Sequence, residues 1–501
     1  VRHGYLIEGR GLSDTPCLVV AADPTRIDEV RARAPQQYRG IPVDVRPASL
    51  RDQAEGTGLE ISEEAAFAIA YDDENRTGKD FSFDWVDEPM EAILHVGPER
   101  SWTVLSEFLR GTKKKLVSSI YEFHAEHIAK AIEKELGEGA SLKLVMAPQS
   151  RDPKSGTLAD GDFKRRPRFE KWADDFGDDF ERVFVPVGNG KLVAKAYHIK
   201  VTVRDGKRFW LSSGNWKRAS QPNIAKKDLD DPRATGRAGN REWHAVIENK
   251  TLASRYENHI LADYERSVEL GGTPEAVEEE VMVDVPIGAL EAIALEAAPK
   301  QVFEPLHLNR RIRVKPLLTP DQKGAVYSKA VLELIRSAKK QILFQNQYIT
   351  VEPSSSGFFS QLVDALVERS RKIADVRIVL RSGGDGFFDN MAELKRRGMD
   401  VNQCVRRISA THTKGIVVDG KKVLLGSQNW SSLGVTLNRD ASLLFDDEEI
   451  AQYFAAVFEE DWERSAAIEA EAPFAGSPRI AVGPEPPPGF VRMPLSQYLE
   501  G

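Results

Sequence analysis

The chain is poor in cysteine and has no long apolar segment. Only Cys17 and Cys404 occur among 501 residues, which excludes a disulfide framework and a cysteine-based zinc site. No stretch of about twenty consecutive apolar residues is present, so we expect no helix that spans a bilayer. The first residues also lack the apolar core of a secretory signal. The chain begins at Val1 rather than at a methionine, which leaves an upstream segment open, and the default expectation is a cytoplasmic location.

A strong charge of one sign is also missing. The net charge is −8, with 41% hydrophobic and 29% charged residues, which is ordinary for a soluble globular protein. This balance argues against a protein that binds nucleic acid over its whole surface, although a local basic groove is compatible with it. A chain of 501 residues has room for about two to four domains with large cores.

A motif with the pattern His-x-Lys-x-x-x-x-Asp is present twice. The first copy holds His198, Lys200 and Asp205, and the second holds His412, Lys414 and Asp419. Each copy leads to a Ser-x-Asn-Trp phrase, and in both the tryptophan stands eighteen positions after the histidine. Two copies with one spacing are far less expected by chance than one, so the sequence predicts an internal repeat with a shared chemistry.

Paired histidines and lysines suit the cleavage of a phosphodiester bond. One imidazole can attack phosphorus while the other protonates the departing oxygen, and both titrate near neutral pH. Each lysine follows its histidine by two residues, which in a strand places both side chains on one face, so we expect both to reach the same phosphate oxygens. Hydroxyl and amide groups after each motif suit the non-bridging oxygens: Ser213, Asn215, Ser427 and Asn429. This chemistry needs no metal ion, and we expect no cofactor.

The two motifs resemble those of the phospholipase D superfamily, whose paired His-Lys-Asp motifs meet at one active site. The likeness between the two copies continues into Asn240-Arg241-Glu242 and Asn438-Arg439-Asp440, and into the matching phrases 263–267 and 461–465. In that family the carboxylate of the Asn-x-acid segment orients the catalytic imidazole. The resemblance therefore implies that Glu242 orients His198 and that Asp440 orients His412.

The same resemblance implies a role for each histidine. In members with two motifs the first histidine usually attacks, so His198 is expected to form a phosphohistidine intermediate. His412 is then expected to act as the acid and later as the base. Asp205 and Asp419 are expected to be structural residues of the motif rather than catalytic ones.

Alternating strands and helices predict an α/β fold in which a mixed sheet covered by helices is built twice. The first run has strands at 90–96, 115–121 and 141–146 and helices at 99–109 and 125–136. The second has strands at 312–318, 341–348 and 374–381 and helices at 323–337 and 357–370. We expect these two phospholipase D-like repeats to pack face to face with pseudo-two-fold symmetry, which would place His198 beside His412.

The expected domains follow from these runs and from changes in composition. They are a small N-terminal α/β module at 1–52, a linker at 53–88, the first repeat at 89–270, a bridging segment at 271–308, the second repeat at 309–470 and a Pro-rich tail at 471–501. The module should contain strands at 17–22 and 41–46 and a helix at 24–33.

Several other signals support two readings each. The first repeat has twenty-three residues between Trp216 and Asn240, where the second has seven, and this insertion either borders the site and influences substrate choice or is a harmless loop. The basic cluster 164–168 either holds phosphates or is a solvated turn. The phrase 345–348 either reaches the site or ends a core strand. His124 and His127 share a helix face but lack a third ligand, so we expect no metal site there.

Three functions remain open on the sequence. The leading one is a phospholipase D-like phosphodiesterase, a hydrolase or transphosphatidylase that acts on glycerophospholipid headgroups, because both motifs lie on one chain as in lipid-acting members. It would contact a membrane surface without insertion and act as a monomer. The alternatives are a metal-independent nuclease of the same superfamily and a non-catalytic protein that binds phosphate.

Overall fold

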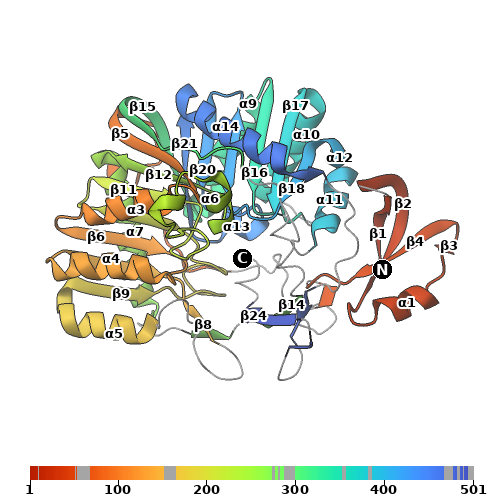
Figure 1. Cartoon of the computed structure of the whole chain (residues 1–501), viewed down its shortest axis with the longest axis horizontal. Helices are drawn as coiled ribbons and strands as arrows, with labels where there is room; N and C mark the ends of the chain where they lie inside the picture. Colours follow the sequence, from red (N-terminus) through yellow and green to blue (C-terminus); the bar gives the residue numbers. More distant parts are fainter. Residues whose placement is uncertain are drawn as a thin grey trace.

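The fold consists of two equivalent α/β halves with a small module at the N-terminus (Figure 1). The computed structural model describes residues 1–8, 11–50, 52–53, 68–151, 165–272, 277–279, 282–286, 299–351, 357–381, 386–467, 478–481, 486–488 and 490–494.

The first half contains the elements that the first run predicts and a further set around the histidine motif. In chain order these are β5 (Val86–Gly97), α3 (Ser101–Arg110), β6 (Lys115–Ile120), α4 (Glu126–Gly137), β7 (Ser141–Met146), β8 (Gln149–Arg151), α5 (Arg165–Phe176), β9 (Phe180–Phe184), β10 (Lys200–Arg204), β11 (Arg208–Ser212), α6 (Pro232–Ala238), β12 (Glu242–Glu248) and α7 (Lys250–Glu269).

The second half repeats this order. Its elements are β15 (Leu306–Thr319), α9 (Ala325–Ser337), β16 (Gln341–Asn346), α10 (Gly357–Lys372), β17 (Asp375–Arg381), α11 (Phe387–Arg396), α12 (Val401–Cys404), β18 (Val405–Ile408), β19 (Lys414–Val418), β20 (Lys422–Gly426), α13 (Ser432–Thr436), β21 (Asp440–Asp446) and α14 (Glu448–Arg464). The helix expected from residue 323 begins at Ala325, because Gln322, Lys323 and Gly324 have left-handed backbone conformations.

Strand order confirms the repeat and the mixed α/β class. A single fifteen-stranded sheet runs β22-β18-β17-β16-β19-β20-β21-β15-β5-β12-β11-β10-β6-β7-β9, where β22 is Ala466–Ala467. The order outward from β15 matches the order outward from β5, and these two long strands pair antiparallel at the centre. The shared strand pair was not expected from the sequence.

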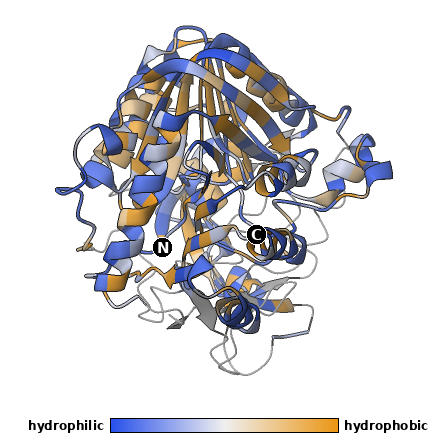
Figure 2. Cartoon of the chain, turned by 90° about the vertical axis from the view of Figure 1, so that its left-hand side faces the viewer, coloured by the Kyte–Doolittle hydropathy of each residue, from blue (hydrophilic) through white to orange (hydrophobic). Residues whose placement is uncertain are grey.

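The two halves also pack against each other through their sheet faces. Strand β12 contacts β19 and β20, and β11 contacts β20. At this contact the Trp243 ring lies so close to Gly415 that a Cβ atom there would come within 2.2 Å of it. Hydrophobic residues are concentrated on the strands in the middle of the molecule, whereas the outer helices carry many hydrophilic ones (Figure 2). The core between the halves therefore fixes how the two motifs face each other.

The last helix of each half begins in the same way. The side chain of Asn249 caps α7 by accepting a hydrogen bond from Leu252 N, and Asp447 caps α14 by accepting one from Ile450 N. Each helix buries apolar residues at helical spacing, which holds it against the sheet. These are Leu252, Ala253, Tyr256 and Ile260 in α7, and Ile450, Ala451, Phe454, Val457 and Phe458 in α14.

The N-terminal module is a small four-stranded sheet with one helix. Its elements are β1 (Arg2–Glu8), β2 (Gly11–Ala22), α1 (Ile27–Arg33), β3 (Gln37–Tyr38) and β4 (Ile41–Pro47), in the order β1-β2-β4-β3. The module lies beside α11 and α12 (Figure 1), where Asn402 donates to Leu12 O at 2.9 Å. Leu12 belongs to the core of the second half, so the module packs on that half.

The segments between the domains carry structure of their own. In the expected bridging segment β13 (Val277–Glu279) pairs with β8, and β14 (Met282–Pro286) pairs with β23 (Arg479–Ile480) and β24 (Phe490–Pro494). Most of the remaining bridge and tail, including residues 287–298, 468–477 and 495–501 and both Glu485 and Gly489 of the Pro-rich phrase, lies outside the described residues.

Within the part of the chain that the structure describes, no helix combines the length and the apolar character needed to cross a bilayer.

Candidate active site

Each histidine stands just before a strand, at a point where the two halves pair through their backbones. His198 N donates to Arg439 O at 2.8 Å, and His412 N donates to Arg241 O at 3.0 Å. Short β-bridges join Tyr197 to Arg439 and Thr411 to Arg241. The acidic residue after each arginine is therefore brought beside the histidine of the opposite half.

The carboxylates are consequently exchanged between the halves. His198 Nδ1 lies 2.7 Å from Asp440 Oδ1, and His412 Nδ1 lies 2.9 Å from Glu242 Oε1. The expectation that each half supplies the carboxylate for its own histidine is wrong. The reason is that the backbones of the two halves pair across the interface, and this pairing cannot be inferred from the sequence pattern of one repeat. Since each pair joins one half to the other, both histidines lie at the interface.

Glu242 is ionised in this arrangement. Burial by itself would raise the pKa of Glu242, but the contact with His412 and the charge of Lys414 outweigh it and lower the pKa to about 2. The carboxylate is completely buried, so its charge acts on His412 with little screening by water.

The serines of the motifs bind these carboxylates. Ser213 Oγ donates to Glu242 Oε2 at 2.5 Å, and Ser427 Oγ donates to Asp440 Oδ1 at 2.6 Å. Their expected role as phosphate ligands is therefore corrected. A hydroxyl has one hydrogen to donate, and both serines give it to the orienting carboxylate.

The two lysines lie next to their own histidines. Lys200 Nζ donates to His198 O at 2.5 Å, and Lys414 Nζ donates to His412 O at 2.9 Å and lies 3.0 Å from His412 Nε2. The ring of Tyr121 faces both members of the first pair, with its centroid 5.0 Å from that of His198 and 5.2 Å from Lys200 Nζ. Both ammonium groups are thus held within reach of the imidazoles, as their spacing predicts.

The two asparagines are buried beside the motifs. Asn215 Nδ2 donates to Glu122 Oε2 at 2.7 Å, and the same carboxylate lies 3.1 Å from Lys217 Nζ. Asn429 occupies the corresponding place in the second half and is 5% exposed.

The aspartates of the motifs are turn residues. Asp205 accepts hydrogen bonds from the backbone N–H groups of Lys113, Lys114 and Lys115. Asp419 accepts the equivalent bonds from Lys339, Lys340 and Gln341. Both aspartates have a positive φ of 54° in a strand-to-strand turn. These contacts support their structural role.

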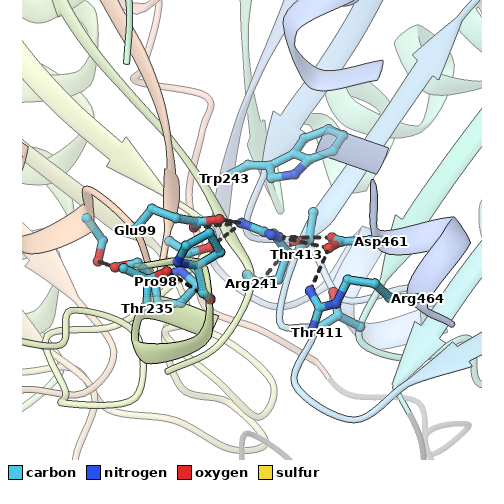
Figure 3. Close-up of polar contacts among 12 residues, drawn as sticks. Pro98, Glu99, Thr235, Arg241, Trp243, Thr411, Thr413, Asp461 and Arg464 are labelled. Atoms are coloured by element: carbon cyan, nitrogen blue, oxygen red, sulfur yellow. Dashed lines mark hydrogen bonds and ion pairs between the residues drawn. The ribbon is translucent and has the colours of Figure 1, made fainter. Parts of the chain in front are cut away.

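Two buried arginines hold the exchanged segments, a role that the sequence analysis did not assign. Arg241 reaches between Glu99 and Asp461 (Figure 3), at 2.7 and 2.9 Å. Arg439 makes the same kind of contact with Asp263, at 2.8 Å, and with Asp321. The signal was present, because Asp263 and Asp461 open the repeated phrases 263–267 and 461–465.

The structure bears differently on each of the weaker sequence signals. Gln345 donates to Thr411 Oγ1 and Asp461 Oδ2, so its strand ends at the interface. In the basic cluster, Arg166 pairs with Glu170 and Arg168 with Glu126 and Glu133, while Lys164 lies outside the described residues. In the insertion, Ser220 Oγ donates a hydrogen bond to Glu242 Oε1 at 2.8 Å. Among the described residues, no three His, Cys, Asp or Glu side chains are grouped as metal ligands.

Parts of the chain are similar to known proteins. A family model described as "Cardiolipin synthase, PLD-like domain" matches residues 331–462, which include the second motif. The probable cardiolipin synthase YwiE of Bacillus subtilis (strain 168) is 28% identical over 152 residues, covering 29% of this chain and 28% of that protein. A phospholipase D of Rickettsia conorii (strain ATCC VR-613 / Malish 7) is 30% identical over 95 residues, covering 19% of this chain and 46% of that protein. The chain belongs to the phospholipase D superfamily.

The alignments with these members of the phospholipase D superfamily are partial, since the chain spans less than half the length of either curated relative. The likeness in fold is wider. The crystal structure of phosphatidylserine synthase from Haemophilus influenzae Rd KW20 matches 76% of this chain and 89% of that one, with a TM-score of 0.50 and 13% identity. A match of that extent exceeds either repeat alone, so both repeats share the fold of that protein.

Proposed function

We propose that the chain is a phosphodiesterase that cleaves or exchanges the headgroup bond of glycerophospholipids through a phosphohistidine. The observation that carries this proposal is the pair of exchanged contacts, His198 with Asp440 and His412 with Glu242. Two imidazoles, each oriented by a buried carboxylate from the other half, are the arrangement that two-step transfer at phosphorus requires.

In the first step His198 attacks and His412 protonates. His198 Nδ1 is engaged by Asp440, so Nε2 is the nitrogen directed away from the carboxylate, and it forms the bond to phosphorus. The bond from phosphorus to the headgroup oxygen breaks, and that oxygen takes the proton of the His412 imidazolium. Lys200 and Lys414 stabilise the negative charge on the non-bridging oxygens.

In the second step His412 acts as the base. It removes a proton from water or from an alcohol, whose oxygen attacks phosphorus while the bond to His198 Nε2 breaks. Water gives a phosphatidic acid, and an alcohol gives a new phosphodiester. Trapping a phosphoenzyme on His412 instead of His198 would reverse the two roles.

Two considerations support a lipid over a nucleic acid. The two curated relatives are named as a probable cardiolipin synthase and a phospholipase D. Two arginines of the basic cluster that favoured a nuclease are neutralised, because the carboxylates of Glu126, Glu133 and Glu170 pair with Arg166 and Arg168. Paired arginines offer little attraction to a phosphate backbone.

The decisive experiment is a substrate panel in the presence of EDTA. Vesicles containing phosphatidylcholine and phosphatidylethanolamine, single-stranded DNA and a chromogenic bis-aryl phosphate are incubated with the wild type, His198→Ala and His307→Ala. His307 is an exposed histidine of β15 and serves as the matched control. We expect headgroup release by the wild type and the control, and a loss of at least about 10⁴-fold in His198→Ala.

Each of the other outcomes would indicate a different function or contradict the mechanism. Degradation of DNA without headgroup release would make the chain a nuclease. A failure to turn over any diester, with phosphate still bound, would leave a non-catalytic phosphate-binding protein. Release by His198→Ala at the wild-type rate would contradict the proposed mechanism.

A further inference from the structure

The carboxylates that orient the two histidines are hydrogen-bonded differently. Glu242 accepts from Ser213 at Oε2, from Ser220 at Oε1 and from His412. Asp440 accepts from Ser427 and His198 at Oδ1 alone, and its buried Oδ2 has no hydrogen-bond partner among the described residues. One carboxylate therefore has a hydroxyl on each oxygen, and the other has one oxygen without any.

The additional donor comes from the insertion in the first repeat. Ser220 stands four residues after Trp216, and four residues after Trp430 the second repeat has Gly434, which has no side chain to donate. Ser220 is completely buried, and its segment is fixed by two contacts, from Asn240 N to Ala219 O at 2.6 Å and between His127 Nε2 and Gln221 O at 2.8 Å.

The backbone opposite Ser220 is shaped to admit it. A Cβ atom on Gly214 would lie 2.5 Å from Glu242 Oε1 and 2.8 Å from Ser220 Cβ, so only glycine fits there. The second repeat has Gln428 at the matching position, where its side-chain oxygen accepts a hydrogen bond from Ser442, and its acid is the shorter Asp440. In the first repeat, Glu242 and Ser220 therefore pack closely against the backbone of Gly214.

Hydrogen bonds to a carboxylate disperse its negative charge and make it a weaker partner for a cation. Glu242, with a hydroxyl on each oxygen, stabilises an imidazolium at His412 less than it would without Ser220. Asp440 keeps one oxygen free of donors and stabilises an imidazolium at His198 more strongly. An imidazolium that loses its proton readily is the better acid, and a strongly polarised imidazole is the better nucleophile.

We propose that Ser220 is a positioning residue that lowers the proton affinity of His412 through Glu242 and so makes the two histidines chemically unequal. The assignment of His198 as nucleophile and His412 as acid rests on the proposed function. The difference in hydrogen bonding between Glu242 and Asp440 does not depend on it.

Two charged groups contact His412 directly, and a third titratable group lies beside one of them. Lys414, from β19, and Glu242, from β12, contact His412, and His244, also from β12, acts on the Glu242 carboxylate. Burial lowers the pKa of His244 to about 4, so this ring is neutral at neutral pH. Arg241 directs its guanidinium to Glu99 and Asp461 instead. Ser213 and Ser220 are both neutral donors to Glu242, but Ser213 has a counterpart in Ser427, whereas Ser220 has none. Removing the Ser220 hydroxyl therefore changes how the Glu242 charge is dispersed without adding or removing an ion.

The test compares Ser220→Ala with Thr235→Val in the full chain. Thr235 also has a buried hydroxyl in the insertion, but it donates to Asp231 O and Pro232 O, away from Glu242. The titration midpoints of the His412 and His198 rings are followed by NMR, and the pH profile of kcat is followed on the bis-aryl phosphate. We expect Ser220→Ala to raise the His412 midpoint by roughly 0.5–1 pH unit and to leave His198 in place. Thr235→Val should move neither.

Where Ser220→Ala does not fold, Ser220→Cys keeps the volume and replaces a strong donor with a weak one, so a smaller upward shift is expected. An unchanged His412 midpoint in folded variants would overturn the proposal, as would equal shifts of both histidines. If the His412 ring shifts but no diester is turned over, the positioning role stands and the proposed function fails. If diesters are turned over but the His412 midpoint does not shift, the proposed function stands and the positioning role of Ser220 fails.

Discussion

The two acids that contact the histidines differ in length, because the side chain of Glu242 has one methylene group more than that of Asp440. Their surroundings differ as well. Glu242 reaches His412 past Gly214, whereas the shorter Asp440 reaches His198 in a half that has Gln428 in place of this glycine. Because the Glu242 carboxylate is buried, its charge has to be stabilised by the groups that contact it. The charge state of Glu242 therefore links the stability of the fold to the contact with His412.

The ionisation of Glu242 predicts how stability depends on pH. Its pKa falls from an ordinary 4.5 to about 2 in the folded protein, so its contribution is fully present above about pH 4.5. The contribution is lost as the pH falls towards about 2, and it amounts to at most about 3 kcal/mol. Urea unfolding of the wild type and Glu242→Gln should show a difference in stability that shrinks between pH 5 and pH 2.

The control for this measurement is Glu248→Gln on the same strand. The Glu248 side chain is 33% exposed and pairs with Arg208 and Lys207 at the surface, so its replacement should cost little. A difference between the wild type and Glu242→Gln that stays constant across the pH range would contradict the expected ionisation.

At the scale of the elements, a segment expected to be a linker braces the first motif. Tyr71 OH donates to Asp321 at 2.8 Å, and Arg76 pairs with Asp263 at 2.6 Å. These are the two acids that hold Arg439, whose backbone accepts from His198. The segment 68–83 therefore contacts the buried charges that hold Arg439, next to His198.

This arrangement predicts a large cost for removing Arg76. Its side chain is 5% exposed and that of Asp263 is completely buried, so Arg76→Met leaves Asp263 with less compensation and should destabilise the fold by about 3 kcal/mol. Lys134→Met breaks an exposed pair with Glu138, and it should cost under about 1 kcal/mol. Chemical denaturation of both variants checks the comparison. Equal small losses would mean that the segment does not brace the fold.

At the scale of the whole molecule, the candidate active site is built from both halves. Each half contributes a histidine to one pair and a carboxylate to the other, and the pairing of β5 with β15 together with the packing of β12 on β19 holds them in register. Any change that separates the sheet faces should therefore damage both pairs at once.

Gly415→Ala tests this dependence. The added methyl group would lie 2.2 Å from the rigid Trp243 ring, which cannot move away because it also packs against Phe454. We expect a loss of about 1–3 kcal/mol in stability. A fall in kcat should follow, because Glu242 is next to Trp243. Gly137→Ala, where nothing lies within 4 Å of the new atom, should change neither stability nor kcat. Full activity in Gly415→Ala would show that the site tolerates separation of the halves.

The local structure was predictable from the sequence, because it depends on neighbours along the chain. Periodicity placed the strand at 141–146 and the helix at 357–370 close to their observed bounds, and the spacing of the motifs placed each lysine beside its histidine. The likeness of the two repeats also identified the superfamily.

Only the tertiary structure decided which carboxylate serves which histidine, what the motif serines bind and what the insertion supplies. These contacts join residues far apart in sequence, such as His198 and Asp440, and they follow from backbone pairing at Arg241 and Arg439 across the interface. A pattern that repeats identically in both halves is satisfied equally by pairing within a half and by exchange between halves. The packing of the two sheet faces selects the exchange.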